Sequence, residues 1–281
     1  FTLTVNVNPA FSVSATVSNY NGFQISSAGA SDGFINLTPS GGSGSYTYSW
    51  TGPNGFTASN QNITGLAPGV YTVTVSDGLC PGIIQTFTIT EPLPLVIAEV
   101  TASHVNVDCF GQSTGEIEVA ITTVSIAPFD YAILLPDGTV VQNADNLTAL
   151  NHTFSNLPAG TYNIKVTDAN GTIKFINGIQ ITQPASGLAI TGSLVSNFNG
   201  FSISCNGAQN GSIDLTVSGG YPGYTYNWTG PNGFTATTQD LTNLNPGVYT
   251  VTILDTTNAC PVTQSFTITA VSYTHLRAHE T

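Results

Sequence analysis

The chain has 281 residues, of which 15 are acidic and 3 are basic, so its formal net charge is −12 at pH 7. A surface that binds nucleic acid needs clustered Lys and Arg, and this composition excludes one. Charged side chains make up 6 % of the residues, against roughly 25 % in ordinary soluble domains, while 41 % are hydrophobic. No apolar run approaches the roughly 18 residues that a membrane-spanning helix needs. We therefore expect a folded, exported protein with an uncharged exterior of Thr, Ser, Asn and Gly.

Residues 1–8 are the first predicted strand. Their apolar side chains Phe1, Leu3, Val5 and Val7 alternate with polar ones, which gives a strand one apolar face. The chain offers this strand no partner, because each repeat described below has a terminal strand of its own. Either a preceding repeat is missing, or the strand is donated to a neighbouring subunit by β-strand addition.

An internal repeat follows. The segments that start at Tyr46 and Tyr224 read YTYSWTGPNGFTA and YTYNWTGPNGFTA and lie 178 residues apart. A middle copy is indicated by a second motif, PGVYTVTV, which recurs in related form around Tyr71, Tyr162 and Tyr249. Three tandem units of about 90 residues are therefore predicted. Their ranges are 9–91, 92–183 and 184–270, and Pro-bearing linkers near 92–94 and 184–187 separate them.

Each unit has the sequence pattern of β-structure. Apolar and polar residues alternate over Thr72 to Val75 and over Phe87 to Thr90, as in strands with one face on a core. The pair Asn54-Gly55 is typical of a tight hairpin turn with positive φ. We expect an all-β chain of three antiparallel β-sandwiches in an elongated array.

The aromatic residues allow two interpretations. Trp50 and Trp228 lie mid-strand, where an exposed indole would offer sugars a stacking platform and a buried one would anchor the core. We favour the core. The three recurring tyrosines follow a turn at the start of a strand, which is typical of a tyrosine corner.

The motifs resemble those of the SprB-type repeat of cell-surface proteins in the Bacteroidetes. They comprise the Gly-rich strand GSIDLTVSGG from Gly211 to Gly220, a Tyr-x-Tyr-x-Trp strand, and a Leu-x-Pro-Gly-x-Tyr-x-Val turn that closes with Asp and Cys. The resemblance covers nearly all of residues 9–270. It implies Ig-like folds in secreted surface adhesins or filaments, and no catalytic activity. Repeat 2 departs from the pattern, because its aromatic strand from Phe129 to Ile133 has no Trp and an extra hairpin is expected around Asp137.

The resemblance also implies a disulfide between Cys205 and Cys260, both in repeat 3. Repeat 1 has Ser27 at the Cys205 position, which leaves Cys80 without a partner, and repeat 2 supplies only Cys109. Cys80 and Cys109 therefore bridge neighbouring repeats or subunits, or remain as buried thiols, and the sequence leaves both alternatives open.

Metal and catalytic sites have little support. Asp77, Asp168 and Asp255 recur at the same turn and are weak candidate calcium ligands, although Asp favours such turns without any ion. His104 and His152 have no second ligand at metal spacing. No set of nucleophile, His and acid is recognisable, so we expect no cofactor and no enzyme activity.

Glycosylation is a further hypothesis. Asp255-Thr256-Thr257 resembles an O-glycosylation signal of the Bacteroidetes, which makes Thr256 a candidate. Seven Asn-x-Ser/Thr sequons provide further candidates at Asn36, Asn62, Asn146, Asn151, Asn170, Asn210 and Asn227.

The expected function is structural. We expect an extracellular fibril subunit that forms a head-to-tail homopolymer by strand donation. The alternatives are a stalk segment of a long cell-surface adhesin and a carbohydrate-binding accessory module that recognises surface glycans. The tail 271–281 does not continue the repeat and resembles translated sequencing-adapter sequence, so no function is expected of it.

Overall fold

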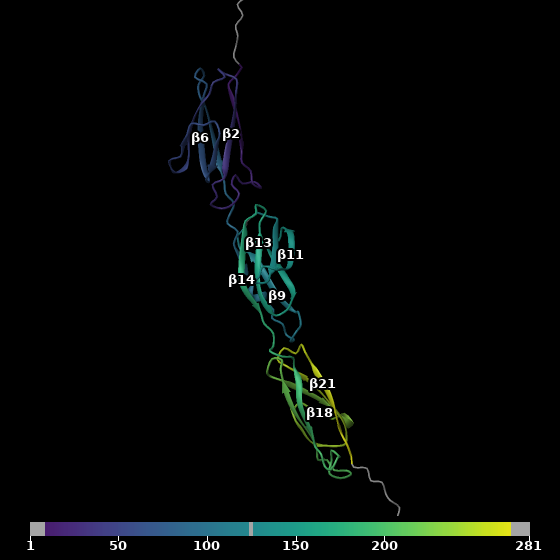
Figure 1. Ribbon diagram of the computed structural model, residues 1–281. Helices are drawn as coiled ribbons and strands as arrows, with labels where there is room; N and C mark the ends of the chain where they lie inside the picture. The colour runs from purple at the N-terminus through teal and green to yellow at the C-terminus, as the bar shows by residue number, and fades with distance from the viewer. Residues whose placement is uncertain (1–8, 124–125, 271–281) are drawn as a thin grey trace, which may run out of the picture. The chain divides into compact units, whose positions relative to one another are not determined.

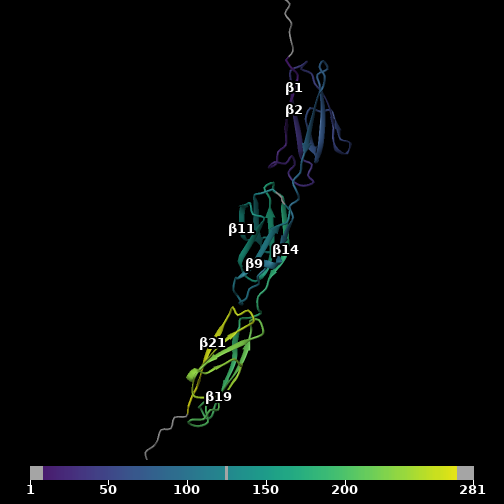
Figure 2. The ribbon, with the colours of Figure 1, turned by 180° about the vertical axis from the view of Figure 1, so that it is seen from behind.

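The computed structural model describes residues 9–123 and 126–270. Within these residues the regular structure is β, with three single-turn 3-10 helices and no α-helix (Figure 1, Figure 2). The described strands form six sheets, and the register of their pairs is antiparallel. The all-β prediction is confirmed. The expected donor strand with Phe1, Leu3, Val5 and Val7 and the tail 271–281 both lie outside the described residues.

The described residues divide into two compact units. The first lies within Phe1–Thr101, Glu118–Thr153 and Tyr162–Ile179, and the second within Ala102–Ile117, Phe154–Thr161 and Gln180–Thr281. The division cuts through four strands: β9 (Gly115–Ile121), β12 (Asn151–Leu157), β13 (Gly160–Thr167) and β14 (Ile173–Ile181). The three-repeat boundaries at 92 and 184 remain a prediction from sequence.

The first two sheets share one core. One sheet has the order β1-β2-β5 and the other the order β4-β3-β6-β7. Their strands are β1 (Ser12–Val17), β2 (Gly33–Ser40), β3 (Thr47–Thr51), β4 (Thr57–Ala58), β5 (Ile63–Leu66), β6 (Gly69–Ser76) and β7 (Ile83–Ile89). Every second side chain of β6, from Tyr71 to Val75, is buried and packs in one cluster with Ile35 and Leu37 of β2. This period-two burial is why the sequence alternates, and it makes the pair a β-sandwich.

The middle sheets have the orders β12-β9-β8 and β11-β10-β13-β14. Their remaining elements are β8 (Ile97–Glu99), η2 (Thr101–Ser103), β10 (Phe129–Leu134) and β11 (Val140–Leu147). β10 and β11 form the extra hairpin that the sequence predicts around Asp137. The Leu135 N–H donates to the Thr139 carbonyl at 2.8 Å, and Gly138 supplies the positive φ of 89° that the turn requires.

The last two sheets repeat the arrangement of the first two, with the orders β15-β16-β19 and β18-β17-β20-β21. Their strands are β15 (Ala189–Val195), β16 (Gly211–Ser218), β17 (Thr225–Thr229), β18 (Thr235–Ala236), β19 (Leu241–Leu244), β20 (Gly247–Leu254) and β21 (Val262–Ile268). Trp228, Tyr249 and Val251 lie in the core that these two sheets enclose.

The Asn-Gly hairpin turns are confirmed. Asn54 and Gly55 have φ of 54° and 77° within η1 (Pro53–Gly55), and β3 pairs with β4 on either side of it. Asn232 and Gly233 do the same within η3 (Pro231–Gly233). Positive φ at both central residues is the geometry that Asn and Gly tolerate best.

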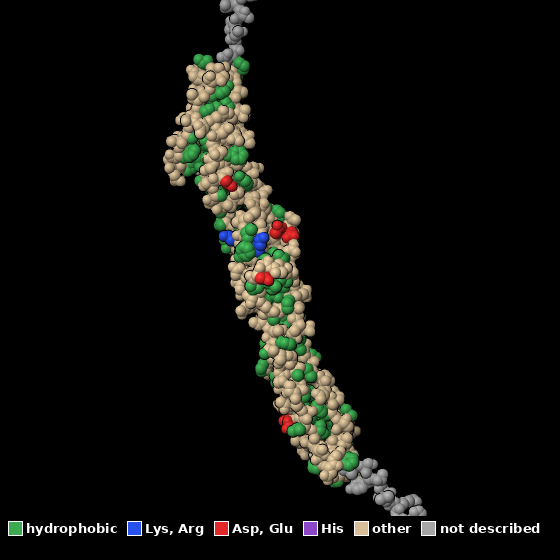
Figure 3. Space-filling view, in the orientation of Figure 1, with side chains coloured by type: hydrophobic (Ala, Val, Ile, Leu, Met, Phe, Trp, Pro, Cys, Tyr) green, Lys and Arg blue, Asp and Glu red, His purple; other side chains and the backbone are tan. Residues whose placement is uncertain are grey.

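The surface matches the composition. Figure 3 shows a face that is mostly uncharged, with apolar side chains interspersed and few acidic or basic groups. Among the described residues, no helix is long and apolar enough to cross a membrane.

Candidate functional site

Two kinds of turn recur along the chain and carry the cysteines. We call residues 77–80, 168–172 and 255–260 the aspartate turns, since each begins with a buried aspartate. We call residues 27–30, 109–112 and 205–208 the glycine turns, since the third residue of each is a glycine with positive φ. The candidate site is the place where a glycine turn meets the aspartate turn of the next predicted repeat. We call this place a join.

The aspartate turns are held by backbone hydrogen bonds to the carboxylate. Asp255 Oδ1 accepts the Thr257 N–H at 3.0 Å and the Thr257 hydroxyl at 2.7 Å, while Oδ2 accepts the Tyr221 N–H at 3.0 Å. Asp77 Oδ1 likewise accepts the N–H groups of Leu79 at 3.0 Å and Cys80 at 2.8 Å. The carboxylates therefore fix the shape of the turn.

Asp168 takes the same role in the middle aspartate turn. Its Oδ1 accepts the N–H groups of Asn170 at 3.0 Å and Thr172 at 2.9 Å. All three buried aspartates thus use side-chain oxygens for turn contacts, which leaves fewer oxygens for an ion.

Hydrogen bonding controls the charge state of two of these aspartates. The N–H groups of Cys80 and Leu79 hold the pKa of Asp77 below its usual value. For Asp255, burial alone would raise the pKa, but the hydrogen bonds from Thr257, Tyr221 and Asn258 outweigh it and lower the pKa. Within residues 9–123 and 126–270, no group of three or more His, Cys, Asp or Glu side chains could hold a metal ion.

The glycine turns have one geometry. Ala30, Gln112 and Ala208 each donate their N–H to the carbonyl three residues earlier, at 3.0, 3.0 and 3.1 Å. Those carbonyls belong to Ser27, Cys109 and Cys205, so serine or cysteine always occupies the first position of the turn. The residue two positions before it is fully buried in each case, as Ile25, Val107 and Ile203 are.

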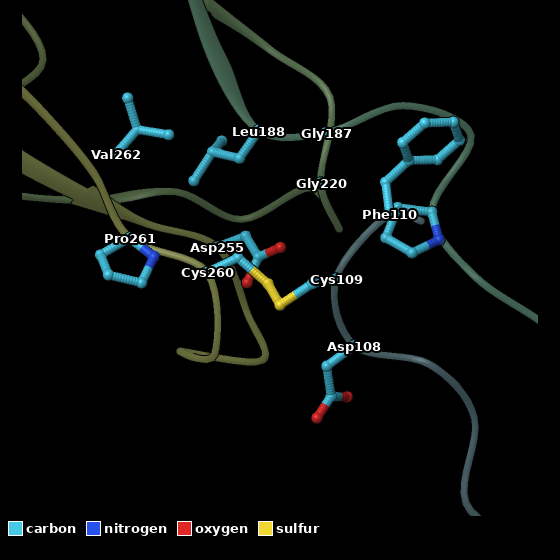
Figure 4. Close-up of a pocket in the computed structure, with 11 residues that line it drawn as sticks. Asp108, Cys109, Phe110, Gly187, Leu188, Gly220, Asp255, Cys260, Pro261 and Val262 are labelled. Atoms are coloured by element: carbon cyan, nitrogen blue, oxygen red, sulfur yellow. A yellow bond between two sulfur atoms is a disulfide. The ribbon is translucent and has the colours of Figure 1, made fainter. Parts of the chain in front are cut away.

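The disulfide joins a glycine turn to an aspartate turn. Cys109 bonds to Cys260, with a Cα–Cα separation of 5.8 Å across 151 residues of sequence. Figure 4 shows the bond, with Asp255 on the side of Cys260 and Asp108 and Phe110 flanking Cys109. The Tyr221 hydroxyl donates to the Val107 carbonyl at 3.4 Å and adds a polar contact to the same join.

The predicted bond between Cys205 and Cys260 is therefore wrong. The two turns lie beyond opposite ends of the eight-residue strand β16. A strand of that length spans about 26 Å at ~3.3 Å per residue, whereas the Cα atoms of a disulfide lie within about 7 Å. Of the two alternatives that the sequence left open for Cys109, the structure has the bridge, to Cys260 of the next predicted repeat. Cys80 and Cys205 are exposed free thiols, so the buried-thiol alternative is wrong for Cys80.

The equivalent join between repeats 1 and 2 is polar. The Asn170 amide Nδ2 donates to the Ser26 carbonyl at 2.8 Å, and Asn21 Nδ2 donates to Asn170 Oδ1 at 2.7 Å. Ser27 and Thr172 line a small pocket here, as Cys109 and Cys260 do at the other join. Sequence reasoning left the partner of Cys109 open and missed the join between repeats 1 and 2. The available signal was that Ser27 and Thr172 stand in the first join where Cys109 and Cys260 stand in the second.

The two tryptophans and the recurring tyrosines belong to the cores. Trp50 and Trp228 are 1 % and 0 % exposed, and their indole N–H groups donate to the carbonyls of Asn60 and Thr238, both at 2.9 Å. Neither offers sugars a platform. The tyrosine corners are confirmed at Tyr71 and Tyr249, whose hydroxyls donate to carbonyls four residues upstream at 3.0 Å. Tyr162 is buried at the corresponding position of β13.

Most of the candidate glycosylation sites are exposed. The exposed ones are Asn36, Asn62, Asn146, Asn151, Asn210, Asn227 and Thr256. Asn170 is half-buried, and its amide nitrogen is engaged by Ser26 in the join between repeats 1 and 2. A glycan on that nitrogen would disrupt the join, so Asn170 is a poor acceptor. Asn151 Nδ2 and Asn210 Nδ2 also donate hydrogen bonds, at 2.8 Å each, but on the surface.

Comparison with known proteins confirms the resemblance stated from the motifs. The family model of the SprB repeat matches three regions, residues 28–55, 101–138 and 202–233. These regions include parts of all three predicted repeats. No curated protein matches the chain.

Several solved structures of low identity also match. Immunoglobulin domains 1–5 of Sidekick-1 are 13 % identical with a TM-score of 0.36, over 93 % of this chain and 60 % of that one. A tetra-tandem repeat in the extending region of a large adhesion protein is 14 % identical with a TM-score of 0.29, over 95 % and 76 %. The BSP domain of a biofilm-associated protein is 11 % identical with a TM-score of 0.27, over 96 % and 68 %. The chain thus spans about three fifths of the Sidekick-1 structure.

Proposed function

We propose that this chain, which carries SprB-repeat sequence in three regions, is a non-enzymatic structural module of an extracellular bacterial fibril. The observation that carries the proposal is the disulfide between Cys109 and Cys260, which joins two consecutive predicted repeats covalently. Such a tie would strengthen an array under load, because interfaces between domains of one chain are typically modest in area and polar. Structural disulfides also persist mainly in oxidising, extracellular compartments.

The distribution of buried polar groups supports a structural role. The buried aspartates of the described chain, Asp77, Asp168 and Asp255, all hold turns. The two tryptophans and the recurring tyrosines are used by the cores. The surface is built from uncharged polar groups, and such a surface tolerates the covalent addition of glycans at sites such as Thr256.

Assembly by strand donation completes the proposal. The alternating segment 1–8 has the sequence of a terminal repeat strand, and insertion into a second subunit would satisfy its backbone and its apolar face together. A contact of this kind joins two different surfaces, so it propagates into a head-to-tail filament instead of closing a dimer.

A stalk within a longer cell-surface adhesin is the second candidate. The same covalent join between repeats favours it, since a stalk also transmits load along consecutive domains. In that case the chain would stay monomeric as isolated, and adhesive specificity would belong to other parts of the protein. The carbohydrate-binding alternative loses its main support because both tryptophans are buried.

Electron microscopy and light scattering of three proteins test the proposal. They are the intact chain, a variant without residues 1–8, and a matched variant with Leu3→Ser, Val5→Ser and Val7→Ser. Filaments from the intact chain alone would support strand donation through the apolar face. Filaments from all three would overturn strand donation, and monomers from all three would favour the stalk.

A further inference from the structure

We infer that Cys205 and Cys80 are the two halves of one intermolecular disulfide, in which Cys205 of one chain bonds to Cys80 of a second copy. The inference rests on the proposed head-to-tail assembly and adds a covalent bond to it. The Cys109–Cys260 bond shows what the completed join looks like.

Cys205 occupies the same position as Cys109. Each is the first residue of a glycine turn, whose third residue has φ of 78° at Gly111 and 81° at Gly207. Each follows a fully buried residue by two positions, Val107 in one case and Ile203 in the other. These anchors fix the direction of the turn, so the exposed Cys205 thiol is presented as Cys109 presents its sulfur.

Cys80 corresponds to Cys260 relative to the strand that follows, although Cys80 lies three residues after its turn aspartate and Cys260 lies five residues after its own. Each closes an aspartate turn and is followed by a proline and then by the last strand of its repeat. Asp77 orients this end of repeat 1, because Oδ1 accepts the Cys80 N–H at 2.8 Å and Oδ2 accepts the Ser43 N–H at 3.2 Å. Asp255 makes the corresponding contact to the Tyr221 N–H at 3.0 Å.

The two free thiols lie where a head-to-tail contact needs them. The Gly42 N–H donates to the Pro9 carbonyl at 2.9 Å, so the aspartate turn with Cys80 lies beside the point where the chain enters repeat 1. The Ser202 N–H donates to the Thr269 carbonyl at 3.1 Å, so the glycine turn with Cys205 lies beside the point where the chain leaves repeat 3.

The glycine turns and the aspartate turns differ in which of them carry a cysteine. The join between repeats 2 and 3 has a cysteine on both sides, and the join between repeats 1 and 2 has Ser27 and Thr172 instead. Repeat 1 then has Cys80 and repeat 3 has Cys205 as a free thiol. A second copy supplies both missing halves, since its repeat 1 presents Cys80 to the Cys205 of the first.

The bond forms by oxidation of two thiols. The Cys205 and Cys80 thiols together lose two protons and two electrons, and a disulfide oxidant such as oxidised glutathione accepts them and departs as two thiols. The exchange proceeds by thiolate attack through a mixed disulfide, which both exposed thiols can reach.

Two single variants, incubated with oxidised glutathione separately and together, test the pairing. Cys80→Ser retains only Cys205 as a free thiol, and Cys205→Ser retains only Cys80. On non-reducing gels each variant alone should remain monomeric. The mixture should give a heterodimer roughly tenfold or more above the dimer of either variant alone, because docking raises the effective thiol concentration. Peptide mapping should identify the Cys205–Cys80 link.

A displaced thiol is the matched control. Leu79→Cys in a background of Cys80→Ser and Cys205→Ser places a single free thiol on an exposed residue one position away, and mixing it with Cys80→Ser should give far less heterodimer. Symmetric dimers of either single variant, an internal Cys80–Cys205 bond in the intact chain, or equal cross-linking by the displaced thiol would each overturn the inference. Filaments without the Cys205–Cys80 peptide would refute the bond and leave the proposed assembly standing. Formation of the heterodimer without filaments would support the bond and refute the proposed filament assembly.

Discussion

Cys109 and Cys260 are 151 residues apart in sequence, yet their Cα atoms lie 5.8 Å apart in a disulfide. The bond connects the start of one predicted repeat to the end of the next. In the chain-entropy account of disulfides, such a long closed loop restricts the unfolded chain strongly. The bond is therefore expected to stabilise the second compact unit as well as to tie its parts together.

Removing this bond should lower stability. We expect Cys109→Ser to reduce the free energy of unfolding of the unit that contains it by about 3–5 kcal/mol. Urea denaturation followed by Trp228 fluorescence measures the loss, because this indole is buried in the same unit. Cys205→Ser is the control and should leave the transition unchanged, since Cys205 is a free exposed thiol. Equal effects of the two substitutions would contradict the account.

Removing the buried Asp255 carboxylate should also lower the free energy of unfolding. Asp255→Ala leaves the N–H groups of Tyr221 and Thr257 without their acceptor. Each unsatisfied donor costs about 1–3 kcal/mol, so the two together should lower the free energy of unfolding by about 2–6 kcal/mol in denaturant. Asp214→Ala, on the exposed face of β16, is the matched control and should cost little. An equal cost at both positions would mean that charge alone matters.

Low pH should lower the thermal stability of the protein. The folded pKa of Asp77 and of Asp255 lies below the usual value of 3.8. Their stabilisation is therefore present above that value and is lost as the pH falls through the folded pKa. Thermal melts of the wild type should shift downward below about pH 4, and Asp255→Asn should weaken this dependence. An unchanged acid dependence in the variant would exclude Asp255 as a contributor.

High pH should destabilise the fold through Tyr131. Burial raises the pKa of Tyr131 from 10.0 to about 12, and its hydroxyl donates to the Ala149 carbonyl at 2.7 Å. The neutral phenol is favoured in the folded state, so its stabilisation is complete below pH 10 and is lost as the pH rises towards 12. Tyr131→Phe should unfold with a weaker dependence on pH over this range, by circular dichroism. A steeper dependence in the variant would contradict the assignment.

Most of the fold could be predicted because its determinants are local. Alternation along β6 and β20 marks which side chains face the core, and Asn54-Gly55 encodes its hairpin turn in two residues. The internal repeat strengthened the prediction, since the alternating strands and the Asn-Gly turn occur in more than one repeat. Even the departure of repeat 2 was readable, because the extra turn carries its own Asp-Gly sequence at Asp137.

The pairing of the cysteines could not be predicted in the same way. Both Cys205 and Cys109 lie at the expected position of a repeat. The pairing of Cys260 with Cys109 and the distance along β16 exclude the bond within repeat 3. The contact between Asn170 and Ser26 joins residues 144 positions apart and leaves no local pattern. Contacts between repeats depend on which ends meet, and that relationship is not encoded in either repeat alone.

The join between repeats 1 and 2 should accept an engineered disulfide. Ser27 is the first residue of its glycine turn, as Cys109 is, and Thr172 lines the same pocket as Ser27, as Cys260 does with Cys109. In a background of Cys80→Ser and Cys205→Ser, we expect Ser27→Cys with Thr172→Cys to form an internal bond. Intact mass should fall by two hydrogens relative to the reduced protein.

Two further variants test whether formation of the engineered bond depends on the position of the thiols in the two turns. Thr172→Cys alone has no partner thiol and should stay reduced, and Ala28→Cys with Thr172→Cys shifts one thiol along the turn and should oxidise more slowly. The bonded protein should gain about 2–4 kcal/mol against urea, provided that the Asn170 contact to Ser26 is kept. If both double variants oxidised at one rate, the two joins would not share the geometry that relates Ser27 to Cys109. Selective oxidation of the first would mean that the chain uses one kind of join twice, once with hydrogen bonds and once with a covalent bond.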